Sequence, residues 1–178
     1  MSFRSFTLIG ASFALLATAV VAVPSPADAA PRDKRFFDSV AGIWTGPGEI
    51  VAGKYKGTKF TCNLTGISST GPAGLTLDGT CRVGVFSQPM KAVISQVGNG
   101  YQGKFLDGAE GKGLDIISGN VSGNKVVMGI NRAKLNGAMV ASLKNQTAMN
   151  ITISVKVEDQ LVPVIGLSLN RQAAARAD

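Results

Sequence analysis

The 178-residue sequence contains no histidine and only two cysteines, and these absences exclude several kinds of functional site. Without histidine there is no imidazole base, no His-ligated metal and no Ser-His-Asp or Cys-His catalytic machinery. Two cysteines cannot form a four-cysteine zinc site or a multi-disulfide framework. The sequence therefore predicts no cofactor, no metal site and no recognisable catalytic constellation, so the protein is not expected to be an enzyme.

Charged residues are also scarce, at 16% of the chain, and most of them are basic. Lys and Arg number 18 against 11 Asp and Glu, which gives a formal net charge of +7. A low charge content combined with 45% hydrophobic residues predicts a folded domain rather than a disordered chain.

Residues 1–29 have the organisation of a secretory signal peptide. Arg4 supplies the basic start, residues 6–23 form an almost uninterrupted apolar run, and Ala27-Asp28-Ala29 is a small-x-small cleavage site. The alternative is an uncleaved membrane anchor, although the run is only just long enough to span a bilayer. We therefore predict cleavage before Ala30 and export to the periplasm, with the extracellular medium as the alternative. No stable membrane span would remain, and export makes nucleic acid an unexpected partner.

After cleavage, we predict a mobile N-terminal arm at 30–36, a β-domain at 37–171 and a C-terminal tail at 172–178. From Trp44 onward, nine or ten short runs alternate apolar and polar residues, with glycine-containing turns between them, Asn136-Gly137 among these turns. Closure of so many consecutive antiparallel strands removes exposed edges. The predicted fold class is all-β, an antiparallel up-and-down β-barrel of about 8–10 strands, with a two-sheet sandwich as the alternative.

Residues 58–67 and 75–86 form the clearest predicted hairpin. If the hairpin is symmetric about Gly71-Pro72, Cys62 lies opposite Cys81 and both point to the apolar face. An even cysteine count, predicted export and directly opposed positions favour a structural disulfide over a reactive pair of thiols.

The segment from Phe37 to Trp44, which contains Gly42-Ile43-Trp44, resembles the entry of calycin barrels, the lipocalin-like group. In that group a short helical turn delivers a Gly-x-Trp to the first strand, and a basic residue near the end of the last strand packs across the tryptophan. The resemblance implies that Trp44 and Arg171 close the narrow end of the barrel, and that the open end binds a small apolar molecule. The glycine-rich continuation 45–48 departs from the usual pattern. A second resemblance is to small periplasmic barrels that inhibit metalloproteases, which also begin with Gly-x-Trp and carry one disulfide.

Two sets of side chains are candidates for binding. Large side chains with inward parity could line a cavity, with core filling as the alternative: Phe60, Tyr101, Phe105 and Met128. Basic side chains near the first turn and on the outer face could meet an anionic partner, with a solvated face as the alternative: Lys54, Lys56, Lys59 and Arg82. The carboxylates fall mostly in turns, for example Asp107 and Glu110, so an enzyme that uses carboxylates alone is the least supported hypothesis.

The sequence thus predicts an exported, non-enzymatic barrel that binds a small apolar ligand or an envelope component. The alternative is a protein-interaction module, such as a protease inhibitor or an envelope structural factor, that acts through an exposed loop or the basic residues 31–35. A ligand-binding barrel should contain a dry cavity on the order of several hundred Å³ that reaches the surface. An inhibitor should bury its N-terminal arm in a protease cleft, so that deletion of residues 30–36 abolishes inhibition and leaves the fold intact.

Overall fold

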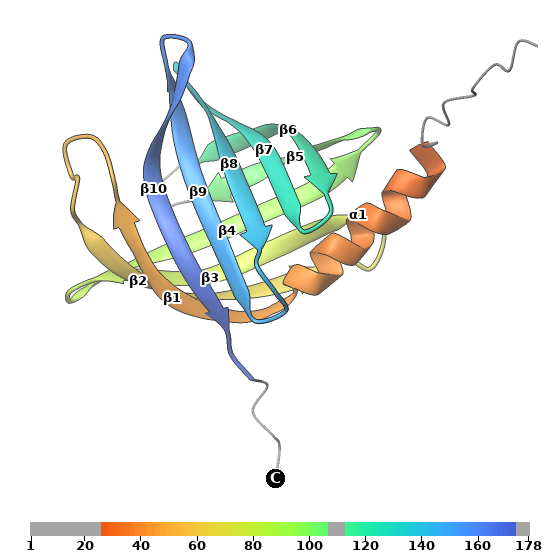
Figure 1. Cartoon of the computed structure of the whole chain (residues 1–178), viewed down its shortest axis with the longest axis horizontal. Coiled ribbons are helices and arrows are strands. Elements are labelled where there is room, and N and C mark those ends of the chain that lie inside the picture. The colour runs from red at the N-terminus through yellow and green to blue at the C-terminus, as the bar shows by residue number, and fades with distance from the viewer. Residues whose placement is uncertain (1–25, 107–112, 174–178) are drawn as a thin grey trace, which may run out of the picture.

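The structure is a computed structural model that describes residues 26–106 and 113–173, and this part of the chain forms one helix and ten strands (Figure 1). Every strand is antiparallel to its two neighbours, and β1 pairs with β10 to close the barrel. The predicted all-β, up-and-down barrel is therefore confirmed, and the sandwich alternative is wrong. The elements are α1 Pro26–Val40, β1 Gly42–Ile50, β2 Lys59–Ser68, β3 Gly74–Val83, β4 Phe86–Val97, β5 Gly100–Leu106, β6 Leu114–Ser122, β7 Lys125–Arg132, β8 Leu135–Leu143, β9 Ala148–Val157 and β10 Gln160–Arg171.

The hairpin of β2 and β3 has the predicted register. Cys62 pairs with Cys81 and Leu64 pairs with Gly79. The two cysteines form a disulfide between Cα atoms 4.0 Å apart, and Cys62 is fully buried. The predicted disulfide is confirmed, because strand parity and turn position together determine which residues face each other.

The predicted turn at Asn136-Gly137 is wrong, because both residues belong to β8 and the hairpin turns at residues 133–134. The Asn131 side chain donates a 2.7 Å hydrogen bond to the Asn136 side chain across this hairpin. A Cβ on Gly137 would lie 2.2 Å from the Ser154 carbonyl oxygen. Glycine is therefore needed here for the close approach of β9, rather than for a turn.

The N-terminal segment differs most from the sequence prediction. Residues 30–36, expected to be a mobile arm, lie within α1, which covers one end of the barrel (Figure 1). Asp33, Phe36, Phe37 and Val40 are buried, and their spacing of three and four residues places them on one face of the helix. Burial of this face against the barrel holds the segment in place. In the described part of the chain, no helix is both long enough and apolar enough to cross a membrane.

The connections between strands divide into two sets, one at each end of the barrel. The closed end carries α1 and the connections 69–73, 98–99, 123–124 and 144–147. The open end carries the connections 51–58, 84–85, 133–134 and 158–159, and the link between β5 and β6, of which residues 107–112 lie outside the described part. These two ends differ in what they offer to a ligand.

Candidate ligand-binding cavity

The barrel encloses a cavity of about 420 Å³. Phe36, Phe37 and Val40 of α1 line its closed end, and the partly exposed Val83 and Leu135 line its open end. The cavity therefore reaches the surface at the open end, as expected of a ligand-binding barrel. Its volume lies within the range of small-molecule sites, roughly 300–1,000 Å³. The inward faces of the strands supply the rest of the apolar wall, including Leu64, Leu75, Leu77, Ile94, Ile130, Met139, Ile151, Ile153 and Leu167.

The glycine-rich part of β1 has a steric role in shaping this cavity. Gly48 pairs with Phe60 of β2, and a Cβ on Gly48 would lie 2.3 Å from Cε2 of the Phe60 ring. The absent side chain lets the ring lie over β1. The sequence 45–48 that departs from the calycin pattern thus makes room for a cavity-lining aromatic side chain.

The four predicted cavity residues divide into two pairs. Phe60 and Phe105 line the cavity. Tyr101 and Met128 are buried but are not among its lining residues, so their assignment to the cavity wall is corrected to core filling. A Cβ on Gly119 would lie 2.4 Å from the Met128 sulfur and 2.9 Å from the Tyr101 Cβ. The three residues therefore pack together without room for a ligand between them.

The polar side chains of the cavity wall stand at its mouth. Gln88 and Arg132 line it near the outer ends of β4 and β7, whereas the Asn136 side chain lies on the outer face, where it accepts a hydrogen bond from Asn131. No Asp or Glu is among the lining residues in the described part of the chain, and Asp107 and Glu110 lie outside that part. Among the described residues, no three His, Cys, Asp or Glu side chains gather closely enough to hold a metal ion. The cavity therefore offers an apolar interior with a polar entrance.

The fold is found among solved structures, whereas no protein-family model and no curated protein sequence matches the chain. Rv2717c from M. tuberculosis superimposes with a TM-score of 0.57 over 79% of this chain and 98% of that protein, at 12% sequence identity. A protein of unknown function from the DUF3598 family, Npun_R4044 of Nostoc punctiforme PCC 73102, superimposes with a TM-score of 0.49 at 9% identity. That alignment covers 76% of this chain and 49% of the other. The first likeness shows a shared fold, and at this identity it shows only the fold.

The structure brings Trp44 and Arg171 together at the closed end of the barrel. They are paired between β1 and β10, and the Arg171 guanidinium lies 4.3 Å from the centroid of the Trp44 ring. The indole Nε1 donates a 2.8 Å hydrogen bond to the Val40 carbonyl. Arg171 donates to the carbonyls of Ser39, Ala41 and Gln146, so it links the end of α1 to the connection between β8 and β9.

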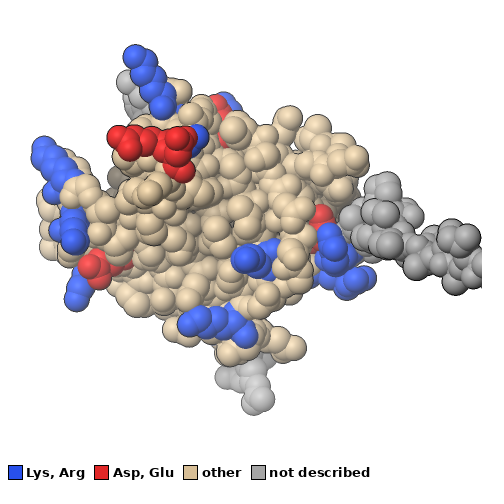
Figure 2. All heavy atoms as spheres, turned by 45° about the horizontal axis from the view of Figure 1, so that its top comes forward, with Lys and Arg blue, Asp and Glu red and all other residues tan. Residues whose placement is uncertain are grey.

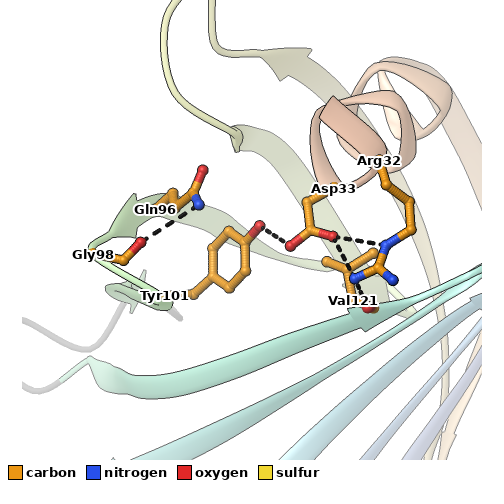
Figure 3. A network of polar contacts seen from close by, with 6 residues as sticks. All are labelled: Arg32, Asp33, Gln96, Gly98, Tyr101 and Val121. Carbon is orange, nitrogen blue, oxygen red and sulfur yellow. Dashed lines mark hydrogen bonds and ion pairs between the residues drawn. The ribbon is translucent and has the colours of Figure 1, made fainter. Parts of the chain in front are cut away.

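A buried polar network fixes α1 on this end of the barrel (Figure 3). Tyr101 of β5 donates a 2.8 Å hydrogen bond to the Asp33 carboxylate, and Arg32 forms a 3.2 Å ion pair with the same carboxylate. Arg32 also donates to the Val121 carbonyl of β6. Burial raises the pKa of the Tyr101 hydroxyl, and its hydrogen bond to the charged Asp33 raises that pKa further. Sequence reasoning missed this network, although the spacing from Asp33 to Phe37 and Val40 could have indicated a packed helical face.

The four predicted basic residues lie in one sector of the open end. Lys54 and Lys56 belong to the connection 51–58, Lys59 begins β2, and Arg82 lies near the end of the adjacent β3. All four are exposed. Lys54 Nζ lies 5.5 Å from the centroid of the Tyr55 ring. In Figure 2, Lys and Arg stand mainly around the margins of the molecule, and the barrel wall between them is largely uncharged.

Proposed function

We propose that this protein is an exported, non-enzymatic, calycin-like barrel that binds a small apolar molecule in its internal cavity. The observation that carries the proposal is the 420 Å³ apolar cavity, open at one end and covered at the other by α1. Transfer of apolar ligand surface from water into such a cavity supplies the binding free energy. Gln88 and Arg132 at the mouth would contact the polar part of a ligand.

Predicted processing of the N-terminus is compatible with this design. Cleavage before Ala30 would remove residues 26–29 from the start of α1. It would retain the face formed by Asp33, Phe36, Phe37 and Val40, which is buried against the barrel. The mature protein would therefore keep its closed end.

A protease inhibitor that inserts residues 31–35 into a cleft finds less support. Asp33 is buried beneath Tyr101, and Lys34 donates hydrogen bonds to the Asp38 side chain at 3.0 Å and to the Ser69 carbonyl at 2.9 Å. The contacts with Tyr101 and Ser69 hold the segment on the barrel, so insertion into a partner would require breaking them. The ligand-binding proposal needs no such rearrangement.

The proposal is tested by titrating the purified protein with N-phenyl-1-naphthylamine, an uncharged apolar dye that fluoresces when it leaves water. We expect saturable binding at one site per barrel. Native mass spectrometry of protein purified from its own host should show a small molecule released together with the protein. Absence of saturable dye binding by protein that is shown to be free of bound molecules would refute the proposal.

Matched substitutions on β8 locate the binding site. Ala141 lines the cavity, whereas Ala138 alternates with the inward-facing Met139 and points to the outer face. We expect Ala141→Phe to weaken dye binding at least 10-fold, because the added ring occupies ligand space. Ala138→Phe should leave it unchanged. Leu77→Phe provides a second cavity variant, and circular dichroism establishes that each variant is folded. Equal effects of Ala141→Phe and Ala138→Phe would place the dye outside the cavity.

A further inference from the structure

The turns at the two ends of the barrel differ in composition. At the closed end, glycine, asparagine and hydroxyl side chains predominate in the connections 69–73, 98–99, 123–124 and 144–147, as is usual for turns. At the open end, Val85 stands at the tip of the β3–β4 hairpin and is 93% exposed, and the adjacent Phe86 is 77% exposed. Nine of the fifteen exposed large hydrophobic side chains of the described residues lie in or beside the open-end connections: Val51, Tyr55, Val83, Val85, Phe86, Leu106, Leu135, Val157 and Leu161.

Positive charge accompanies the apolar tips in one sector of this end. The sector consists of the connection 51–58 and the β3–β4 hairpin, which are neighbours because β2 pairs with β3. We call it the basic rim; it comprises Lys54, Tyr55, Lys56, Lys59, Arg82, Val85 and Phe86. Glu49 faces Lys59 across the strand pair. Two further carboxylates of the open end, Glu158 and Asp159, lie in the separate connection between β9 and β10. Apolar tips flanked by cations are complementary to a surface whose outer layer is anionic and whose interior is apolar.

We propose that the basic rim docks on an anionic lipid bilayer and places the mouth of the cavity against the membrane. Val85 and Phe86 would enter the headgroup region, where burial of their surface is favourable. The lysines and Arg82 would remain at the headgroup level and attract the anionic lipids, each cation adding about 5-fold to the affinity. The cavity opens at this end, between Val83 and Leu135. If the proposed function is correct, an apolar ligand could then pass between bilayer and cavity with little exposure to water.

The charge of the whole protein alone would produce weak, unspecific attraction to such membranes, so the closed end provides the control. Arg35, Lys125 and Lys144 are exposed cations at that end. Ile67, near the closed end of β2, is an exposed apolar side chain, with 63% of its surface accessible. Neutralising or removing these residues changes net charge or apolar surface as the rim variants do, but at the opposite end of the barrel.

The test is co-sedimentation of the protein, lacking residues 1–29, with vesicles of phosphatidylglycerol and phosphatidylcholine in equal amounts, and with vesicles of phosphatidylcholine alone. We expect binding to the anionic vesicles that weakens as salt is added. The triple variant Lys54→Gln/Lys56→Gln/Lys59→Gln should bind on the order of 100-fold more weakly. Val85→Ser/Phe86→Ser should lose at least 10-fold. The control variants Arg35→Gln/Lys125→Gln/Lys144→Gln and Ile67→Ser should retain most of the binding.

Each outcome decides the proposal. Equal losses in the rim and closed-end triple variants would show unspecific charge attraction and overturn it, as would equal binding to the two kinds of vesicle. Failure of the wild-type protein to bind either vesicle would favour a soluble partner for the apolar tips and would also overturn it. N-phenyl-1-naphthylamine binding, measured without vesicles, should be unchanged in the rim variants. That measurement separates failure of membrane docking from failure of the cavity proposal.

Discussion

Removal of the Tyr101 hydroxyl should measure how firmly α1 is held on the barrel. In Tyr101→Phe the ring keeps its contact with Phe37, whose centroid lies 5.4 Å away. The 2.8 Å hydrogen bond to the buried Asp33 carboxylate is lost. Hydrogen bonds to charged groups contribute about 1.5–3 kcal/mol to stability, and a buried charge left with one partner fewer adds a desolvation cost. We expect the free energy of unfolding to fall by about 2 kcal/mol.

Urea unfolding and thermal melting followed by circular dichroism would measure this loss. For a domain of about 150 residues, 2 kcal/mol corresponds to a decrease of roughly 4–8 °C in Tm. Tyr55→Phe serves as the control, because Tyr55 is 63% exposed in the connection 51–58; it should change stability by less than about 0.5 kcal/mol. The double variant Asp33→Asn/Tyr101→Phe should lose less than the sum of its single variants, by about 1 kcal/mol or more. A loss below about 0.5 kcal/mol in Tyr101→Phe, or full additivity in the double variant, would refute the coupling between α1 and the barrel.

Two further predictions concern pH and the disulfide. The folded state raises the pKa of Tyr101 above the ordinary value near 10. The contribution of the Tyr101 hydroxyl to the free energy of unfolding is therefore fully present below about pH 10 and is lost as pH rises further. The stability difference between wild type and Tyr101→Phe should therefore be constant from pH 7 to 9 and shrink above pH 10 in urea titrations; a difference that grows with pH would contradict the assignment. The variant Cys62→Ala/Cys81→Ala should lose about 3 kcal/mol of unfolding free energy, since the disulfide closes a loop between residues 19 apart. A loss under about 1 kcal/mol would show that it adds little to the fold.

The barrel could be predicted from sequence because its signals are local and repeated. Alternation with a period of two residues marks the strands and their inward faces, and short turns fix the register of each hairpin. For this reason the pairing of Cys62 with Cys81 followed from strand parity and the position of the turn. Strand parity could not distinguish Phe60, which lines the cavity, from Met128, which is buried in the core. Parity tells which face a side chain occupies, but whether it meets a cavity or another side chain depends on the strands across the barrel.

The closed end could not be predicted, because its contacts join residues that are distant in sequence. The stretch around Asp33 contains several charged residues, a composition typical of a polar arm. It nevertheless forms a helix that hydrogen bonds with Tyr101 and with the Val121 carbonyl hold on the barrel. The apolar tips of the open end were missed for a different reason. Val85 continues the alternation of β3, and the chain turns there because Gly84 adopts a φ of +56°, which favours glycine.

The pairing of β1 with β10 has a consequence for the order in which the protein can be completed. Synthesis proceeds from the N-terminus, so a growing chain that has reached β9 carries unpaired hydrogen-bonding groups along two edges, those of β1 and β9. Such edges can recruit strands of other chains. They disappear only when the last strand is added, at which point Arg171 also reaches Trp44. A chain truncated before β10 should therefore aggregate rather than yield a smaller stable barrel.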